Sequence, residues 1–269
     1  MKYMIGVDMG TTSTKAVLYD EHGKFIMKHN IGYDLHTPNV DVSEENPDEI
    51  FDAVLMTVKY IVRESGIAKE DIKFISLSAQ MHSLIAMNED NQRLTENITR
   101  ADNRANDYAD LIEKSYGGFE LYQRTGTPIH PMSPLSKIFW MRHEEPEIFK
   151  QTAMFADLKT YVLFQLYERF VIDYSLGSAT GMMNLEQLDW DHKALELLGI
   201  ERNQLPQLVP TTHVLTGMKK RYATLMGIDE QTPVIVGASD GVLSNLGVNS
   251  YEKGEVAVTI GTSGAIRTV

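Results

Sequence analysis

The sequence has no cysteine among its 269 residues, which excludes disulfide bonds, thiolate nucleophiles and cysteine-ligated metal centres. It also lacks a long hydrophobic run, because no segment approaches the ~20 apolar residues that a membrane-spanning helix needs. The apolar N-terminus is interrupted by Asp8 and lacks the basic region that opens a secretory signal peptide. We therefore expect a cytoplasmic protein with no membrane partner.

Basic residues are in deficit. The chain has 25 Lys and Arg residues against 37 Asp and Glu residues, which gives a formal net charge of −12. Nucleic acids and anionic membranes are bound through a basic footprint, so we expect neither as a partner. A small anionic substrate stays compatible with this charge, since a few local cations suffice to bind it.

The chain does have the composition of a folded protein, with 43% hydrophobic and 23% charged residues. Apolar, β-rich segments alternate with segments of helical periodicity, which predicts an α/β fold. Strands are expected at Tyr3 to Asp8, Thr14 to Tyr19, Lys24 to Ile31, Ile72 to Ala79, Leu84 to Met87, Phe170 to Leu176 and Pro233 to Ala238. Helices are expected from Asn46-Pro47 to Gly66, over most of Asp102 to Arg169, and at Gly217 to Met226.

A turn of small hydroxyl residues joins the first two expected strands, in the stretch from Val7 to Ala16. Glycine lets the backbone approach a ligand closely, and hydroxyls and exposed turn N–H groups donate to phosphate oxygens. Asp8, at the end of the first strand, can hold a hydrated Mg²⁺ beside those oxygens. An ordinary hairpin with a polar turn is the alternative interpretation. The residues that we assign to phosphate binding here are Gly10, Thr11, Thr12, Ser13 and Lys15.

The same pattern returns near the end of the sequence, from Val256 to Ile266. Aligned on its glycine, this second segment has Thr259 where the first has Asp8, so only the first offers a carboxylate. Two such hairpins could grip the phosphates of one nucleotide from opposite sides, which resembles the pattern of actin-like ATPases. The phosphate-binding residues expected in the second hairpin are Gly261, Thr262 and Ser263.

Asp240 follows the last apolar strand and is flanked by Gly237 and Gly241, which let the backbone turn and expose its carboxylate. Phosphoryl transfer needs a phosphate cradle, a metal and a group that accepts the proton of the attacking hydroxyl. Asp240 is our candidate for that general base. A plain turn residue is the alternative, because Asp is common in turns.

Together these segments resemble the carbohydrate kinases of the FGGY family, and most closely their gluconate kinase branch. The matches run in family order over almost the whole chain. They are Gly6 to Ser13, Gln80-Met81-His82, Lys137 with Trp140, Pro146 and Glu147, Asp173-Tyr174-Ser175 with Ala179 to Asn184, Leu188 to Asp191, Gly237 to Gly241, and Gly261 to Gly264. The branch is indicated by Asp102-Asn103-Arg104, Arg124 to Pro131 and Gly241 to Gly247.

The resemblance implies an α/β fold of the actin-like, ribonuclease H-like type, with a mixed sheet and helical insertions. It implies a sugar-binding N-terminal domain at residues 1–247 and the first hairpin of the nucleotide-binding domain at 248–269. Because family members continue for roughly another such length, we expect the rest of that domain to be absent from this chain. A homodimer stays open as the assembly state.

The resemblance also implies the reaction, in which ATP, with Mg²⁺, phosphorylates the terminal hydroxyl of D-gluconate to give 6-phosphogluconate and ADP. Asp240 would accept the hydroxyl proton. The residues expected to contact the sugar are Gln80, Met81, His82, Arg104, Asp240 and Gly241.

Gluconate carries a carboxylate that xylulose lacks, so its site should offer a cation, with Arg favoured for bidentate recognition. The candidates are His82, Arg104, Arg124 and Lys137. We select Arg104, with a surface ion pair as the alternative. Arg100 departs from the family, which commonly has Trp at this place, and the sequence assigns it no role.

Two other functions stay open. One is a kinase for xylulose or another neutral sugar, and the other is a non-catalytic, actin-like nucleotide-binding domain. A non-catalytic nucleotide-binding domain would explain the hairpins, but it would not explain Gln80-Met81-His82 or Asp240. A Rossmann dehydrogenase fits poorly, since no Gly-x-Gly-x-x-Gly follows the first strand.

Overall fold

The computed structural model describes residues 1–260 and 264–268, with the backbone alone considered at 259 and 260. The strands are β1 (Tyr3–Met9), β2 (Ser13–Asp20), β3 (Phe25–Gly32), β4 (Glu44–Glu45), β5 (Ile72–Ala79), β6 (Ile85–Met87), β7 (Asn97–Ile98), β8 (Met154–Ala156), β9 (Val171–Asp173), β10 (Met183–Asn184), β11 (Asp189–Trp190), β12 (Gln207–Val209), β13 (Val214–Leu215), β14 (Val234–Ser239), β15 (Val256–Ile260) and β16 (Gly264–Thr268). The helices are α1 (Pro47–Ser65), α2 (Asn106–Ser115), α3 (Gly118–Thr125), α4 (Pro134–Glu144), α5 (Pro146–Gln151), α6 (Leu158–Tyr167), α7 (Tyr174–Ser178), α8 (His192–Leu198), α9 (Lys220–Met226) and α10 (Asp240–Gly247), with short 3₁₀ turns at Lys69–Asp71 and Arg202–Gln204.

A six-stranded mixed sheet in the order β13-β14-β5-β1-β2-β3 organises the molecule. The strands β1, β2 and β3 form an antiparallel meander, whereas β5 and β14 run parallel to β1. Parallel strands bring their carboxyl ends to one edge, where α/β proteins place their ligands. The polar residues at the ends of β1, β5 and β14 therefore gather at that edge.

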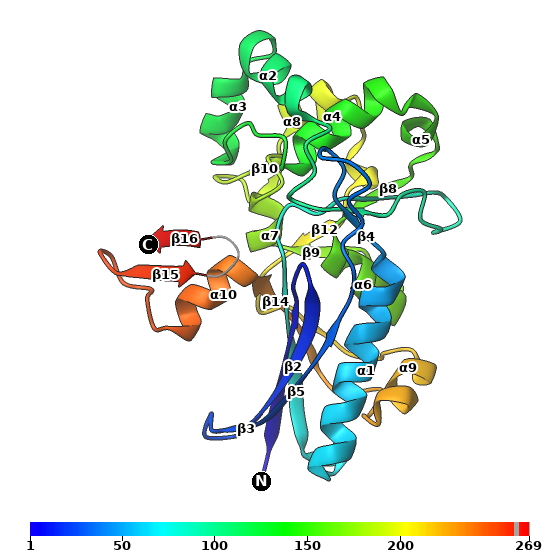
Figure 1. Cartoon of the computed structure of the whole chain (residues 1–269), viewed down its shortest axis with the longest axis vertical. Helices are drawn as coiled ribbons and strands as arrows, with labels where there is room; N and C mark the ends of the chain where they lie inside the picture. Colours follow the sequence, from blue (N-terminus) through cyan, green and yellow to red (C-terminus); the bar gives the residue numbers. More distant parts are fainter. Residues whose placement is uncertain (261–263, 269) are drawn as a thin grey trace.

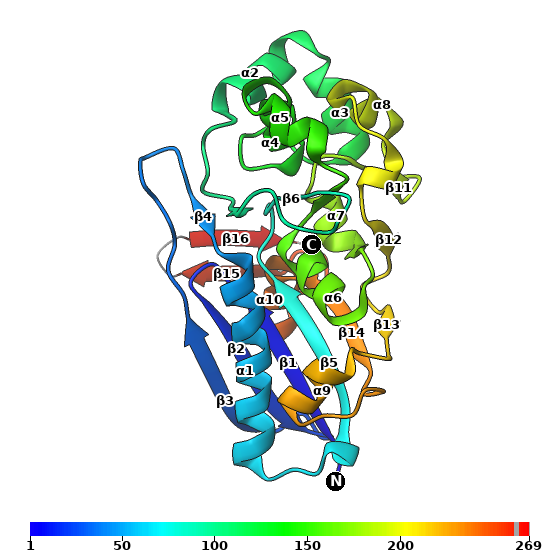
Figure 2. The same ribbon diagram turned by 90° about the vertical axis from the view of Figure 1, so that its right-hand side faces the viewer.

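The two faces of this sheet differ because side chains alternate along each strand. In β1, the residues Ile5, Val7 and Met9 are buried, whereas Asp8 between them is only partly buried. Figures 1 and 2 show α1 and α9 on one side of the sheet and α10 with the β15–β16 hairpin on the other. The apolar side chains meet α1, and Asp8 is left to the α10 side.

Helix α1 begins and ends where the sequence predicts. The Asn46 side chain accepts hydrogen bonds from the backbone N–H groups of Asp48 and Glu49, and Pro47 occupies the first helical position. Gly66 ends the helix at φ +66°, in the left-handed region that favours glycine. The apolar stripe of this helix packs on the sheet, which fixes the orientation of the helix and the sheet relative to each other.

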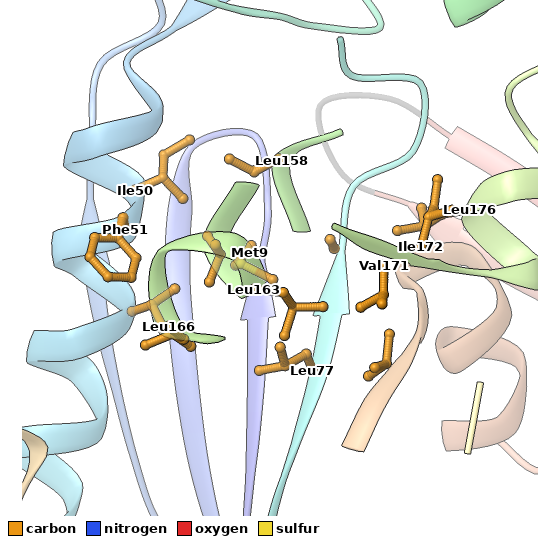
Figure 3. Close-up of a cluster of buried hydrophobic side chains, with 14 of the residues drawn as sticks. Met9, Ile50, Phe51, Leu77, Leu158, Leu163, Leu166, Val171, Ile172 and Leu176 are labelled. Atoms are coloured by element: carbon orange, nitrogen blue, oxygen red, sulfur yellow. The ribbon is translucent and has the colours of Figure 1, made fainter. Parts of the chain in front are cut away.

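One continuous hydrophobic cluster joins the sheet to the helices. In Figure 3, Ile50 and Phe51 of α1 point toward the same cluster as Leu163 and Leu166 of α6, with Met9 at its centre. Helices α2, α3, α4, α5 and α8 form a separate region at one end of the molecule (Figure 1). Among the helices of the described residues, none combines the length and the apolar character that crossing a bilayer takes.

The α/β expectation is confirmed, with one element corrected. The strand expected at Phe170 to Leu176 is limited to β9, because the Asp173 side chain accepts hydrogen bonds from the N–H groups of Ser175 and Leu176. This cap begins α7, so the second half of the predicted strand is helical. The segment from Asp102 to Arg169 is mainly helical, as expected, but also contains β8.

Candidate functional site

A cavity of about 440 Å³ lies on the α10 side of the sheet, near the carboxyl ends of β1 and β5. Asp8, Lys15 and Ser78 line it from the sheet, whereas Asp240 lines it from the start of α10. Two carboxylates, a lysine and a hydroxyl from four segments therefore face one space. This arrangement suits a ligand that carries both hydroxyl and anionic groups.

Strand register brings the two carboxylates together. Asp8 is paired with Ser78 across β1 and β5, and the Ser78 hydroxyl donates a hydrogen bond of 2.7 Å to Asp8 Oδ1. Ser239 pairs with Ala79 at the end of β14, and Asp240 follows directly. Burial raises the pKa of Asp240 above its ordinary value, and the Asp8 charge raises it further. The hydrogen bond from the Gly241 N–H group and the charges of Arg267 and Arg100 lower this pKa but do not cancel the rise. A raised pKa makes Asp240 a stronger base.

The turn that presents Asp240 depends on glycine. Gly237 has φ +71°, and a Cβ built there would lie 1.8 Å from the Leu77 carbonyl oxygen. The register between β14 and β5 shifts at this point. Ser239 then caps α10 by accepting a hydrogen bond from Val242 N. Glycine is required here because β14 passes too close to β5 for any side chain.

The turn between β1 and β2 has its carbonyl groups directed into the protein. The Tyr33 hydroxyl donates to Gly10 O, Tyr33 N donates to Thr12 O, and Gly10 N donates to Ser13 O. Within the described residues, the N–H groups of Thr11 and Thr12 have no protein acceptor. Donors that point outward from such a turn are what an anionic ligand requires. Phosphate binding by this turn stays a prediction.

The second hairpin is present as β15 and β16, which pair antiparallel from Val256 with Thr268 to Ile260 with Gly264. The assigned phosphate residues Gly261, Thr262 and Ser263 lie outside the described residues. Arg267 of β16 lines the cavity of Asp240.

Gln80 is buried in a hydrogen-bond network. Its Nε2 donates to Glu45 Oε2 at 2.7 Å, and its Oε1 accepts from Thr11 Oγ1 at 3.2 Å. Glu45 Oε2 also accepts from Asn97 Nδ2, and burial raises the pKa of Glu45 to about 7. Gln80 thus connects the segment around Asn97 to the turn at Thr11. The structure places it as a positioning residue, and a direct sugar contact stays a prediction.

Met81 and His82 follow at the end of β5. A Cβ built on Gly241 would lie 3.1 Å from Met81 Cε, so Met81 packs against the start of α10. His82 has φ +67°, which is uncommon for a residue with a side chain and often marks a functional position. Its Nδ1 donates to Ala179 O at 2.9 Å, and burial lowers its pKa to about 4. His82 is therefore neutral at pH 7, with Nε2 as an acceptor.

Lys137 lies beneath this segment and is 1% exposed. Its Nζ donates to the carbonyl oxygens of His82 at 2.5 Å, Thr99 at 2.7 Å and Ile98 at 3.2 Å. These acceptors match the three N–H bonds of an ammonium group, although burial lowers the pKa of Lys137 to about 7. Its role is to hold these backbone segments together, so it does not reach a substrate carboxylate.

The structure does not bring Arg104 to the cavity of Asp240. Arg104 forms ion pairs with Glu44 at 2.5 Å and Asp102 at 2.8 Å, and its guanidinium lies 4.7 Å from the centroid of the Trp140 ring. It lines a different cavity. The ion pair that we kept as the alternative is present, and a sugar contact stays a prediction. Arg124 is likewise paired, with Asp191 at 2.9 Å.

The carboxylates can be tested as a metal site. Within the described residues, no group of three or more His, Asp or Glu side chains could hold an ion by itself. Mg²⁺ needs no such group, because it keeps several waters and binds one or two carboxylates together with substrate phosphates. Asp8, with Asp240 across the same cavity, fits that requirement.

Several residues of the site escaped sequence analysis. Ser78 and Glu45 become relevant only through partners that are 70 and 35 residues away, so no local pattern indicates them. Arg267 lies in the second hairpin but outside its glycine–hydroxyl turn. Arg100 stands out in the sequence as a departure, and its charge acts on the pKa of both His82 and Asp240.

Comparisons with known sequences all point to carbohydrate kinases. The profile of the N-terminal domain of the FGGY family of carbohydrate kinases matches residues 3–247. The chain is 53% identical over 267 residues to a gluconokinase of Bacillus subtilis, covering 99% of this chain and 52% of that protein. It is 29% identical to the xylulose kinase of the same organism, covering 99% of this chain and 53% of that protein. The chain spans about half the length of the curated relatives it matches.

Solved structures that superpose on this chain agree with the sequence comparisons. A gluconate kinase from Lactobacillus acidophilus superposes with a TM-score of 0.95 at 40% identity, covering 99% of this chain and 54% of that one. A ligand-bound structure described as a xylulose kinase from the same organism gives a TM-score of 0.96, also at 40% identity, covering 100% of this chain and 54% of that one.

Proposed function

Because this chain belongs to the FGGY family of carbohydrate kinases, we propose that the protein that carries it transfers a phosphoryl group from ATP to the terminal hydroxyl of D-gluconate. The products are 6-phosphogluconate and ADP. The observation that carries this proposal is the meeting of Asp8 and Asp240 at one cavity beside the turn at Gly10 to Ser13. Gluconokinases at 53% and 52% identity support the substrate.

In this proposal Asp240 accepts the proton of the substrate's terminal hydroxyl as its oxygen attacks the γ-phosphorus. Its raised pKa favours proton acceptance, since a base with a very low pKa accepts a proton poorly. Bonds form between the hydroxyl oxygen and phosphorus and break between phosphorus and the bridging oxygen of ADP. Phosphoryl transfer otherwise depends on positioning and charge stabilisation, which the loop donors and Lys15 supply.

Mg²⁺ with ATP completes the proposed site, and it would neutralise phosphate charge when bound. Asp8 would hold it through water, with its carboxylate fixed by Ser78. Thr11, Thr12 and Ser13 would donate to the phosphates from this side. Gly261, Thr262 and Ser263 are proposed to do so from the other.

The sugar is proposed to lie between Asp240 and His82, beside Met81. The neutral His82 offers Nε2 to a sugar hydroxyl, because Nδ1 donates to Ala179 O. Gly241, next to the base, is proposed to contact the polyol. We also propose the division into a sugar-binding domain at 1–247 and the start of a nucleotide-binding domain at 248–269, and the cytoplasm as the compartment.

The test is Asp240→Asn in the complete polypeptide that carries this chain. Asparagine keeps the shape but cannot accept the proton, so we expect kcat to fall about 10²–10⁴-fold. The matched control is Asp110→Asn, at a side chain of α2 that is 60% exposed, which should keep wild-type turnover. Near-normal turnover by the Asp240 variant would remove the proposed base.

A kinase for a neutral sugar such as xylulose is the second candidate. It is favoured by the 40% identity to a solved protein described as a xylulose kinase. ADP formation measured against a panel of sugars and sugar acids separates the two candidates. ATP hydrolysis that no sugar stimulates would contradict both and favour a non-catalytic nucleotide-binding domain.

A further inference from the structure

The backbone that leads into Asp240 is held at both polar groups of one peptide unit. After a shift in register, β14 pairs with β5 at Ala238 and Ser239, and α10 begins at the next residue. Ala238 O accepts a hydrogen bond of 3.2 Å from Lys159 Nζ, and Ser239 N donates one of 2.8 Å to Ser175 Oγ. The carbonyl and the N–H group of the peptide between Ala238 and Ser239 are thus both bonded to side chains from outside the sheet.

A buried ion pair joins these two side chains. Lys159 Nζ lies 2.6 Å from Asp173 Oδ2, and neither side chain is more than 1% exposed. The Ser175 hydroxyl donates a hydrogen bond of 2.6 Å to Asp173 Oδ1, and its oxygen is the acceptor for Ser239 N. The hydroxyl therefore donates once and accepts once, and alanine at this place would remove both bonds. Lys159, Asp173, Ser175 and the peptide unit form a closed ring of polar contacts.

Stability alone does not require this ring. The attraction within a buried ion pair often does no more than offset the cost of removing both charges from water, and apolar residues of similar volume are often as stable. Asp173 caps α7 through the N–H groups of Ser175 and Leu176, for which the Ser175 hydroxyl is not needed. What the hydroxyl adds is a bond to Ser239, the residue before Asp240. A catalytic group has to be held within about 0.5 Å of its productive position.

We propose that Ser175 is a positioning residue for Asp240. Its hydroxyl connects the Lys159–Asp173 ion pair to the peptide unit before Asp240, which keeps the carboxylate aligned with the attacking hydroxyl. Of the described residues, those that line the cavity of Asp240 do not include Ser175, so it acts through the backbone of Ser239. The inference rests on the proposed function, in which Asp240 accepts the proton, and it extends the site to side chains of α6, β9 and α7.

The first test is the turnover of gluconate by two variants of the complete polypeptide. Ser175→Ala removes both bonds of the hydroxyl, so kcat should fall about 10- to 100-fold, because a displacement of about 1 Å can cost about 10²-fold. The KM for gluconate should change less than about threefold, since the loss falls on the chemical step. Ser175→Thr keeps the hydroxyl and should retain most of the wild-type kcat.

A double-mutant cycle shows whether Ser175 acts through Asp240. In the Asp240→Asn background the group that Ser175 positions is already replaced. Adding Ser175→Ala there should lower the remaining kcat less than about twofold. A further loss as large as in the wild-type background would contradict the proposal, because Ser175 would then act on the fold as a whole.

The control is Ser178→Ala, which removes another hydroxyl from α7. Ser178 Oγ donates to Ser175 O and has no bond to β14, so this variant should keep the wild-type kcat and KM. Circular dichroism and the midpoint of urea unfolding compare the folds of all variants. If Ser175→Ala does not fold, Ser175→Cys replaces it, because cysteine keeps the shape but is a weak donor and acceptor. The same loss of kcat is expected from it.

The outcomes separate this inference from the proposed function. A normal kcat in Ser175→Ala, together with the expected loss in Asp240→Asn, would overturn the role of Ser175 and leave the kinase proposal standing. A sugar other than gluconate as the best substrate would overturn the proposed substrate, and the same variants measured with that sugar would still test Ser175. Near-normal turnover by Asp240→Asn would overturn both the base and the inference.

Discussion

At the scale of single residues, Glu45 has an unusual position. It is 1% exposed and its Oε2 accepts two hydrogen bonds of 2.7 Å, from Gln80 and Asn97. Within the described residues, Glu45 Oε1 and Asn97 Oδ1 have no partner. Glu45 Oε1 and Asn97 Oδ1 can both only accept a hydrogen bond when Glu45 is ionised. A proton on Glu45 supplies the donor that this pair of oxygens lacks. This agrees with a pKa that burial raises to about 7.

The proton on Glu45 predicts how stability depends on pH. Because the folded pKa of about 7 exceeds the ordinary 4.5, the contribution of Glu45 is complete below pH 4.5 and is lost as pH rises through 7. Glu45→Gln keeps a donor and an acceptor without a charge. It should be more stable than wild type at pH 8 by on the order of 3 kcal/mol, and similar at pH 5.

Urea unfolding at pH 5, 6, 7 and 8 measures this difference. Glu89→Gln, in an exposed loop, is the control and should follow the wild-type profile. An unchanged pH dependence in Glu45→Gln would mean that Glu45 is ionised in the folded protein throughout this range.

Sequence reasoning at this scale found groups that have a local signature. Asp8 and Asp240 each stand near a strand end with a glycine within two residues, and the structure brings both to one cavity. Arg104 was selected as the cation for the substrate carboxylate because the sequence cannot show that Arg104 is already held by two carboxylates. Those partners, Glu44 and Asp102, are fixed by the pairing of β4 with β7 and by a turn.

At the scale of elements, the close approach of β14 to β5 makes a strong prediction. Gly237→Ala would place a methyl group 1.8 Å from Leu77 O, which forces β14 away from β5. We expect a loss of more than about 3 kcal/mol in the free energy of unfolding, in the range of severe backbone mutations. Asp240 would move with the strand, so kcat should fall as well.

Gly217→Ala is the matched control for this element. Gly217 has φ +76°, but no atom lies within 4 Å of the position that a Cβ would take, so this variant reports backbone strain without a steric clash. The free energy of unfolding of Gly217→Ala should be lower than that of the wild type by about 1 kcal/mol. Chemical denaturation of both variants gives the comparison, and equal losses would show that the contact with Leu77 is not the cause.

Element boundaries were predictable where their signals are local. Helix α1 has its Asn-Pro start and glycine end in the sequence, and both are used as expected. The strand before α7 was predicted too long, because Phe170 to Leu176 is rich in residues that favour strands and contains no glycine or proline that would end one. Only the buried position of Asp173, which caps α7, divides it.

At the scale of the whole molecule, the actin-like, ribonuclease H-like fold expected from two glycine–hydroxyl hairpins is confirmed by its solved relatives. What the sequence could not provide is how distant segments are joined. Lys159 and Asp173 form an ion pair of 2.6 Å in which neither side chain is more than 1% exposed. Lys159 also donates to Ala238 O, two residues before Asp240.

This ion pair predicts an asymmetric response to mutation. Lys159→Met leaves the Asp173 carboxylate buried without its cation and should cost about 3–5 kcal/mol. The double variant Lys159→Met with Asp173→Asn removes both charges while keeping an oxygen to cap α7, so it should recover much of that loss. Thermal and urea unfolding measure both. A double variant less stable than Lys159→Met would contradict this account.

The position of β5 between β1 and β14 has a consequence for synthesis on the ribosome. The strands β1, β2, β3 and β5 all emerge early, whereas β14 is translated only after the intervening helices. Until then, one edge of β5 exposes unpaired backbone groups that any other extended chain can bind. The nascent protein is therefore most vulnerable to aggregation during the translation of those helices, and a chaperone that shields this edge would raise its yield.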